Sequence, residues 1–277
     1  MEKLQIAIEH ARKRRDSGAI DIVNSDELSA EQGPKPQQPS DRWALLEPFE
    51  IKPRLLARNR IACVGDSGSA KNTIDMLRTR LLTMMREKGW TRVMITSPSS
   101  GCGKSTLTAN LALALQRQED LKTLVFDLDL QQAELGRKLG LIPQGGIDEF
   151  LLGEVSALAQ FRRIGDNLAI SAGRKKTPGS TELLKTKGAQ RRIDEAEAEF
   201  SPDVVLFDVP PIFACDDTIV AAGFVDCAII VCAAEQNTIA ELEEVERDLA
   251  QYTNIAGVVL NKCRSLPKQS GYGYNYR

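Results

Sequence analysis

Six short runs of almost uninterrupted apolar residues recur between residues 92 and 262, and most are followed by a stretch with helical spacing. Strands that stay apolar along their whole length are typical of a sheet that is buried on both faces. Their alternation with helices predicts an α/β fold with a doubly wound, mostly parallel sheet, in which ligands bind beyond the carboxyl ends of the strands. We expect these strands at residues 92–97, 123–129, 167–171, 203–211, 227–234 and 257–262.

The composition predicts one globular domain with an extension at each end. Residues 1–15 have helical spacing, with charged residues opposite a short apolar stripe, and predict an N-terminal helix. Residues 16–41 are rich in Gly, Pro, Gln and Ser and predict a flexible linker. We expect the domain at residues 42–266, followed at residues 267–277 by a flexible tail with three of the four tyrosines.

Charge and composition exclude several classes of protein. The 36 Lys and Arg residues nearly balance the 38 Asp and Glu residues, so nothing indicates a nucleic-acid partner. The only histidine, His10, disfavours histidine-dependent catalytic triads and most histidine metal sites. The charged N-terminus is unlike a secretory signal, and no apolar run approaches the roughly 20 residues of a membrane helix. We therefore expect a cytoplasmic protein that can be recruited to a membrane by a partner.

The segment SPSSGCGKST, residues 97–106, joins the first predicted strand to a predicted helix. Glycines permit the tight backbone path that points N–H groups at a phosphate, a lysine reaches the terminal phosphates, and a serine hydroxyl can hold Mg²⁺. Pro98 stands where the usual pattern has glycine, and proline has no N–H, so the entrance of this phosphate loop must differ. The pattern predicts a P-loop nucleotide site with a deviant Walker A motif, formed by Ser100, Gly101, Cys102, Gly103, Lys104, Ser105 and Thr106.

Three aspartates lie at the ends of two of the predicted strands. Asp127 and Asp129 are two residues apart, so their carboxylates share one face of an extended chain, and Asp208 ends another strand of the same sheet. Carboxylates beside a triphosphate repel it unless a cation intervenes, so the cluster predicts Mg²⁺, with Asp208 ordering its water and Asp127 available as a base. Aspartates that cap the following helices are the simpler alternative.

The last predicted strand ends in Asn261 and Lys262. Two interpretations of this pair stay equally open. The side chains can contact the base of a bound nucleotide, or they are ordinary turn residues at the end of a strand.

The segments SPSSGCGKST, LVFDLDLQQAELGRKLG and DVVLFDVPPIFACDD resemble the Walker A, Walker A′ and Walker B motifs of the bacterial tyrosine kinases. These proteins are the autokinases of capsule and exopolysaccharide export. The C-terminal SGYGYNYR is similar to their tyrosine cluster, and the likeness extends from about residue 60 to the end of the chain. Partition and division-site ATPases share the Walker motifs, and the tyrosine tail separates the two groups.

This resemblance implies transfer of the γ-phosphate of Mg-ATP to tail tyrosines, mostly between subunits of the same protein. It also implies a membrane adaptor of the polysaccharide co-polymerase type and a phosphotyrosine phosphatase as partners. By position, the resemblance assigns Lys104, Asp127 and Asp129 to catalysis, Ser105, Asp127 and Asp208 to the metal, and Tyr272, Tyr274 and Tyr276 to phosphate acceptance.

The chain departs from the family pattern at three positions. Aligned on Arg78, Asn72 and Asp75 replace the first two residues of the E-x-x-R-x-x-R motif that many members use to assemble rings, and Gln131 replaces an arginine after the Walker A′ aspartates. Two other functions stay open on these grounds. One is a partition-type switch ATPase, disfavoured because Ser99 stands where those proteins have a lysine, and the other is a non-catalytic nucleotide-sensing adaptor of an export complex.

Overall fold

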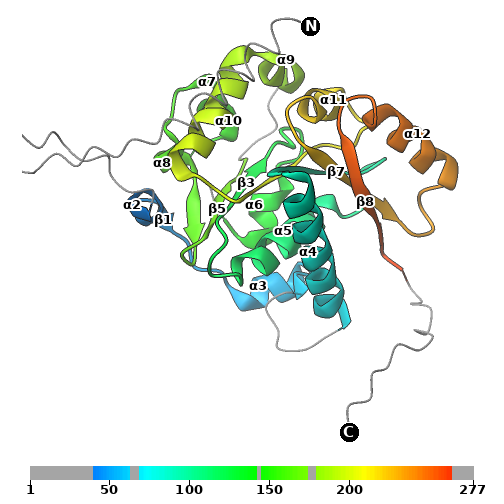
Figure 1. Cartoon of the computed structure of the whole chain (residues 1–277), viewed down its shortest axis with the longest axis horizontal. Helices are drawn as coiled ribbons and strands as arrows, with labels where there is room; N and C mark the ends of the chain where they lie inside the picture. Colours follow the sequence, from blue (N-terminus) through cyan, green and yellow to red (C-terminus); the bar gives the residue numbers. More distant parts are fainter. Residues whose placement is uncertain (1–39, 63–68, 142–144, 174–178, 264–277) are drawn as a thin grey trace, which may run out of the picture. The chain divides into compact units, whose positions relative to one another are not determined.

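A computed structural model describes residues 40–62, 69–141, 145–173 and 179–263 of the chain (Figure 1). Within these ranges the strands form one eight-stranded sheet in the order β1-β4-β5-β3-β6-β2-β7-β8. All neighbours are parallel except β4 and β5, so the predicted α/β fold with a mostly parallel sheet is confirmed. The strands are β1 Glu47–Pro48, β2 Arg92–Thr96, β3 Thr123–Asp127, β4 Arg162–Ile164, β5 Leu168–Ser171, β6 Val204–Asp208, β7 Cys227–Ala233 and β8 Asn254–Asn261.

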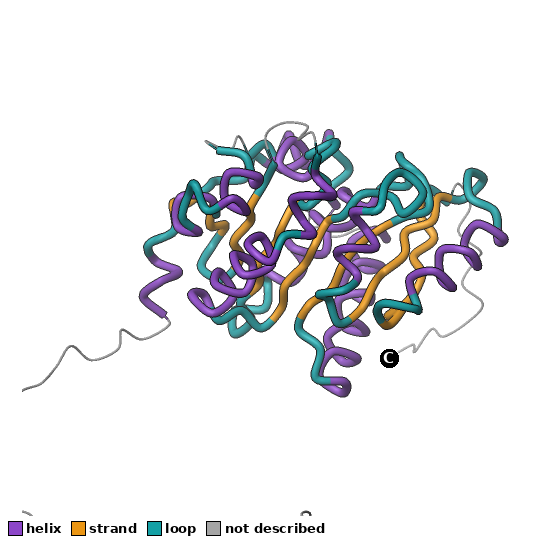
Figure 2. Tube along the Cα trace, turned by 90° about the horizontal axis from the view of Figure 1, so that it is seen from above, coloured by secondary structure: helices purple, strands orange, loops and turns teal. Residues whose placement is uncertain are grey.

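Helices cover both faces of the sheet, as Figure 2 shows from above. Residues of α3 to α6 pack on one face and residues of α7 and α9 to α12 on the other. The helices are α2 Ser40–Ala44, α3 Pro53–Arg58, α4 Ser69–Lys88, α5 Lys104–Gln116, α6 Glu134–Leu139, α7 Ile147–Leu152, α8 Ala157–Gln160, α9 Ser180–Lys185, α10 Lys187–Phe200, α11 Asp217–Ala222 and α12 Ile239–Leu249.

The six apolar runs are the six long strands. Five of them are buried along almost their whole length, which explains why they show no alternation, whereas β8 at the edge of the sheet is only partly buried. In β2, Val93 and Ile95 pack into the core on the α5 side, whereas Met94 packs into the core on the opposite side. Each of these side chains is fully buried, and full burial of such a residue contributes roughly 1.5–3 kcal/mol. Both faces therefore need apolar residues, which is why period-two patterning is missing.

Two parts of the fold differ from the sequence-based expectation. The short strands β1 and β4 extend one edge of the sheet, and their two and three residues are too few to give a pattern. The stretch with helical spacing that follows the third predicted strand, residues 181–200, is expected to be one helix but belongs to two, α9 and α10. Thr186 separates them, because its ψ of 137° is extended and its hydroxyl accepts the N–H of Ala189 as the cap of α10.

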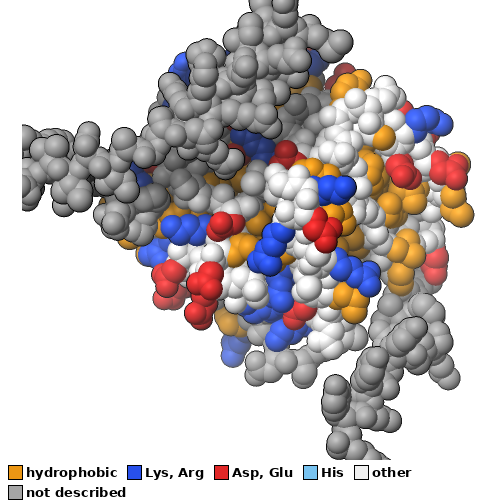
Figure 3. Space-filling view, in the orientation of Figure 1, with side chains coloured by type: hydrophobic (Ala, Val, Ile, Leu, Met, Phe, Trp, Pro, Cys, Tyr) orange, Lys and Arg blue, Asp and Glu red, His pale blue; other side chains and the backbone are white. Residues whose placement is uncertain are grey.

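The expected N-terminal helix, the linker up to residue 39 and the tyrosine tail lie outside the described residues. The described part begins with α2 at Ser40, two residues before the predicted domain border. Acidic and basic side chains are interspersed over the face of the molecule shown in Figure 3. No helix in the described ranges combines the length and the apolar character needed to cross a membrane.

Strand register brings the ends of the central strands to one level. Asp127 of β3 is paired with Asp208 of β6, and Asp208 is in turn paired with Ile95 of β2, one residue before that strand ends. The loop that follows β2 and the two aspartates therefore meet at the carboxyl edge of the sheet, where parallel α/β folds bind ligands.

Candidate functional site

The loop between β2 and α5, residues 97–103, has the backbone path that its glycines predict. Gly101 and Gly103 have φ values of +83° and +100°, in the left-handed region that glycine adopts without strain. Lys104 is the first residue of α5, a helix of 13 residues, so the free N–H groups of the first turn and the positive end of the helix dipole lie beside the loop. This arrangement suits an anion such as a phosphate.

The entrance of this phosphate loop is held through carbonyl groups instead of N–H groups. Ser97 O accepts the N–H of Ile212 at 2.9 Å, and Pro98 O accepts the N–H of Phe213 at 3.3 Å. Pro98 is buried and has no N–H to donate. The segment after β6 therefore stabilises the entrance by donating its own N–H groups to the carbonyl oxygens there.

Gly103 also has no room for a side chain. A Cβ built on it would lie 2.2 Å from Nδ2 of Asn261, which donates a hydrogen bond to Cys102 O at 2.9 Å. Asn261 therefore packs against the phosphate loop from the end of β8. This brace of the loop is a role that neither interpretation of Asn261 included, and the predicted contact with a nucleotide base stays a prediction.

We expect Gly103→Ala to destabilise the loop by about 1–3 kcal/mol, because alanine is strained at positive φ and its methyl group displaces Asn261. Nucleotide titration followed by fluorescence should show weaker binding. Gly89→Ala is the matched control: Gly89 has φ +70°, but no atom lies within 4 Å of a Cβ there. Equal nucleotide affinity in the two variants would contradict the contact with Asn261.

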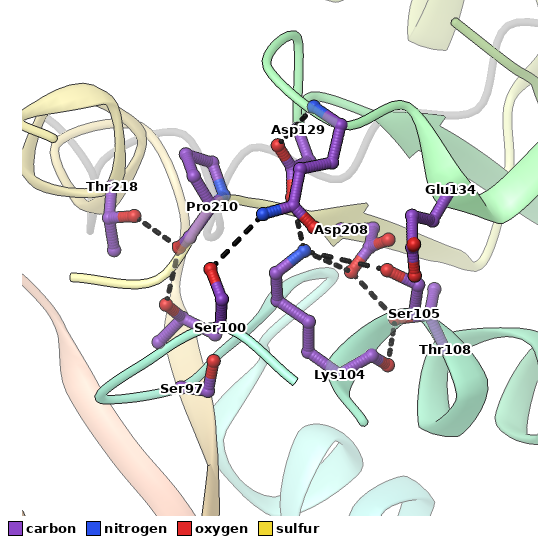
Figure 4. A network of polar contacts seen from close by, with 12 residues as sticks. Ser97, Ser100, Lys104, Ser105, Thr108, Asp129, Glu134, Asp208, Pro210 and Thr218 are labelled. Atoms are coloured by element: carbon purple, nitrogen blue, oxygen red, sulfur yellow. Dashed lines mark hydrogen bonds and ion pairs between the residues drawn. The ribbon is translucent and has the colours of Figure 1, made fainter. Parts of the chain in front are cut away.

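Lys104 lies in a buried group of carboxylates (Figure 4). Its Nζ forms an ion pair with Asp129 and lies 4.0 Å from Oδ1 of Asp208. Burial alone lowers the pKa of Lys104, but the attraction of Asp208, then Asp129, outweighs it and raises the pKa above the ordinary value. The lysine is therefore charged at neutral pH and partly neutralises the cluster.

Asp127 and Asp208 are fully buried at the ends of their strands. In the described ranges neither carboxylate oxygen of Asp127 has a hydrogen-bond partner. Of the two oxygens of Asp208, only Oδ1 has one, and it accepts a hydrogen bond from the Thr108 hydroxyl at 3.2 Å. The Gly173 N–H lies near Asp127 but outside hydrogen-bonding geometry. Burial, and then repulsion from Asp208, raises the pKa of Asp127 well above its usual range. Burial likewise raises the pKa of Asp208, although Lys104 opposes it.

These orphaned oxygens suit a divalent cation, since a buried unpaired carboxylate is costly unless something compensates it. No three His, Cys, Asp or Glu side chains in the described part of the chain are already arranged around a metal position. Mg²⁺ is usually held by one or two carboxylates together with substrate phosphates and water. The residues therefore fit Mg²⁺ that arrives with a nucleotide.

The other predicted loop residues surround this centre. Ser105 is buried, with its Oγ 3.4 Å from Nζ of Lys104, and Cys102 is buried beneath the loop. Ser100 is exposed and its hydroxyl accepts a hydrogen bond from Gln132 at 3.1 Å. The Thr106 carbonyl accepts from Asn110 inside α5.

Two other positions that the sequence analysis singled out, Lys262 and Asp75, have partners away from this centre. Lys262 is exposed, with its ammonium 3.1 Å from Oε1 of Gln236, so the described contacts show no role in the centre. Asp75 pairs with Arg78 and with Arg117, so the residue that replaces the middle position of the ring-assembly motif binds within the chain. Tyr272, Tyr274 and Tyr276 lie outside the described residues.

Two residues at the centre were missed by sequence reasoning. Thr108, one turn into α5, donates to Asp208, and Asn237, after β7, contacts the phosphate loop. Spacing could have found Thr108, because it lies four residues after Lys104 on the same helix face. Asn237 carries no such signal, since it precedes the capping box of α12 and looks like a turn residue.

The comparisons with known proteins agree with this geometry. The family model of the CobQ/CobB/MinD/ParA nucleotide binding domain matches residues 93–270, more than half of the chain. EpsB of Ralstonia nicotianae is 30% identical over 225 residues, which are 80% of this chain and 29% of EpsB. Tyrosine-protein kinase YwqD of Bacillus subtilis is 28% identical over 221 residues, 79% of this chain and 92% of YwqD.

Among solved structures, the kinase domain of the Escherichia coli tyrosine kinase ETK matches with a TM-score of 0.66 and 27% identity, over 78% of this chain and 84% of that domain. The chain spans less than a third of the length of the first curated relatives that it matches. It belongs to the CobQ/CobB/MinD/ParA nucleotide-binding domain family, and its relatives there are bacterial tyrosine-protein kinases.

Proposed function

We propose that this chain is an ATP-dependent protein-tyrosine autokinase that phosphorylates tyrosines of its own tail. One observation carries the proposal: the lysine at the start of α5 lies in a buried cluster with three carboxylates, and three of their oxygens have no hydrogen-bond partner in the described ranges. The names of the relatives YwqD and ETK supply the reaction class, protein-tyrosine phosphorylation.

Each of three residues has its own role in the proposed phosphoryl transfer. Lys104 leaves its ion pair with Asp129 to contact the terminal phosphates, which the loop N–H groups cradle. The carboxylate of Asp127 accepts the proton from the attacking tyrosine hydroxyl. Asp129 holds Lys104 in place before the nucleotide binds.

Ser105, Asp127 and Asp208 would hold Mg²⁺, whose charge, when bound, stabilises the negative charge that develops on the transferring phosphoryl group. The hydroxyl of Thr108 fixes one oxygen of Asp208 and leaves the other available. ATP is the expected nucleotide because the proposed reaction transfers a γ-phosphate.

Tyr272, Tyr274 and Tyr276 are the proposed acceptors, on the same subunit or on another copy of the chain. Eleven tail residues can extend roughly 35–40 Å. The proposed partners are a membrane polysaccharide co-polymerase, which recruits a cytoplasmic kinase to the inner face of the membrane, and a phosphotyrosine phosphatase that removes the phosphates. The pathway served is exopolysaccharide or capsule export, on the family resemblance.

The test is phosphotyrosine formation by the purified full chain incubated with Mg-ATP, alone and with the cytoplasmic part of its adaptor. We expect incorporation into the tail peptide by mass spectrometry, and its loss from a Tyr272→Phe/Tyr274→Phe/Tyr276→Phe variant that still binds nucleotide. Tyr252→Phe is the control, because Tyr252 is half-exposed and lies outside the tail.

Other outcomes point to the other functions. ATP hydrolysis without phosphotyrosine, in the presence of the adaptor, would assign a switch ATPase of the partition type. Nucleotide binding with neither reaction would assign a nucleotide-sensing adaptor. Phosphotyrosine on residues other than these three would overturn the acceptor assignment alone.

A further inference from the structure

We infer that Asn237 is a positioning residue for nucleotide binding: its side chain holds the two ends of the phosphate-contacting turn, Ser99 and Cys102, at a fixed separation. The inference rests on the nucleotide-binding part of the proposed function and not on the identity of the phosphate acceptor. Asn237 follows β7 and lies 138 residues away in sequence from Ser99.

Three hydrogen bonds define the position of this amide. Its Oδ1 accepts the N–H of Ala233 at 2.9 Å, which ties it to the last residue of β7. The same oxygen accepts the Cys102 thiol at 3.1 Å, and Nδ2 donates to the Ser99 hydroxyl at 3.2 Å. Both the oxygen and the nitrogen of this amide therefore form hydrogen bonds with the phosphate loop, and the bond to Ala233 fixes the amide to the sheet.

The two loop residues that Asn237 contacts flank Ser100 and Gly101, which are both exposed. Ser99 and Cys102 also contact each other, with Oγ and Sγ 3.6 Å apart, so the turn is closed beneath its exposed tip. A loop closed in this way presents the N–H groups of its tip in a fixed arrangement before the nucleotide arrives. Preorganisation of this kind improves affinity because less conformational freedom is lost on binding.

This brace has a reason in the sequence. Pro98 removes one N–H and the glycine found at the usual entrance of a P-loop, so the entrance cannot be organised in the usual way. Ser97 Oγ donates to Ser99 O at 2.9 Å, which turns the chain directly after the proline. Asn237 then fixes the Ser99 side chain that emerges from this turn. Asn261 braces the other end of the loop through Cys102 O.

The test is a double-mutant cycle on nucleotide affinity, measured by titrating the full chain with a fluorescent ADP analogue and Mg²⁺. Asn237→Ala should weaken binding about tenfold and Ser99→Ala about threefold, because the first variant loses both loop contacts and the second loses one. The double variant should be no weaker than Asn237→Ala alone, since the Ser99 contact is already lost.

Asn254→Ala is the matched control, because Asn254 also lies at a strand end and its Nδ2 donates to Asp226 O, but at the opposite edge of the sheet. Its nucleotide affinity should equal that of the parent. The melting temperature separates positioning from stability: Asn237→Ala should bind more weakly even where its melting temperature is within a few degrees of the parent.

Rescue gives a second readout. Asn237→Gln keeps the amide on a longer stem, and should recover part of the affinity, whereas Asn237→Leu should not.

An affinity within twofold of the parent in folded Asn237→Ala, or strictly additive effects of the two substitutions, would overturn the inference. If Asn237→Ala does not fold, Ser99→Ala must still lose affinity, and an unchanged affinity there overturns it too. Because ADP binding is measured, a failed phosphotyrosine assay leaves this result unaffected.

Discussion

Lys104→Met should reduce phosphotyrosine formation at least about a hundredfold, the loss typical of removing one group that stabilises charge in a transition state. The same substitution should also destabilise the nucleotide-free protein. Lys104 is the cation paired with Asp129 and lies 4.0 Å from Asp208, so its loss leaves buried carboxylates without compensation. Breaking a buried ion pair by removing one partner costs about 3–5 kcal/mol.

This destabilisation should depend on pH in a defined direction. Lys104 opposes the raised pKa values of Asp127 and Asp208, so without it these folded-state pKa values rise further above the unfolded values. The folded protein then holds protons that the unfolded chain releases. The free energy of unfolding of the variant should therefore fall as the pH rises, more steeply than that of the parent. Thermal unfolding of both proteins between pH 5 and pH 8 measures the difference.

Lys138→Met is the matched control for Lys104→Met. Lys138 also forms an ion pair, with Glu134 at 3.5 Å, but on the surface of α6, where such pairs contribute about 0–1 kcal/mol. We expect parental activity and nearly parental stability. A Lys104→Met protein that keeps its melting temperature at pH 8 would show that the cluster is already neutral in the parent.

Local rules predicted the parts of this site that depend on neighbours in sequence. The position of Asp127 and Asp208 at the carboxyl edge of the sheet could be predicted because both lie near the end of an apolar run, although the strands end two and three residues before the predicted borders. The tight backbone path of the loop could be predicted from Gly101 and Gly103. The parallel sheet followed from the alternation of elements. These features need no knowledge of distant residues.

The contacts between distant segments could not be predicted, because they depend on how the elements pack. Sequence reasoning gave Asn261 two equally open roles, and only the approach of β8 to Gly103 shows it against the loop. The ion pair of Lys104 with Asp129 depends on the path of the chain after β3. Asn237 was missed because its partners Ser99 and Cys102 lie 138 and 135 residues away in sequence, and only the pairing of β2 with β7 brings them close.

Asp127→Asn should make the metal-free protein more stable at pH 8 and reduce phosphotyrosine formation about 10²–10⁴-fold, the usual contribution of a general base. Burial and Asp208 raise the folded-state pKa of Asp127 well above its unfolded value, which is near 3.9. Between these two values the folded state binds a proton that the unfolded state has released. Asp127 therefore does not reduce the free energy of unfolding below about pH 3.9. Above that pH the reduction grows until the pH exceeds the folded-state pKa.

The asparagine cannot ionise, so the difference in the free energy of unfolding between Asp127→Asn and the parent should depend on pH in the same way. It should be zero near pH 3.5 and reach a maximum of about 2 kcal/mol on the alkaline side. For a domain of this size that corresponds to a melting temperature about 4–8 °C higher.

Asp203→Asn is the control, since Asp203 is exposed before β6 and accepts the Lys122 N–H at 2.7 Å. This variant should gain no stability and keep its activity. Mg-ADP should stabilise the parent more than Asp127→Asn, because the variant has lost a carboxylate that would hold Mg²⁺. A less stable Asp127→Asn protein at pH 8 in EDTA would mean that Asp127 is compensated in the folded state, and the case for a cation between Asp127 and Asp208 would fail with it.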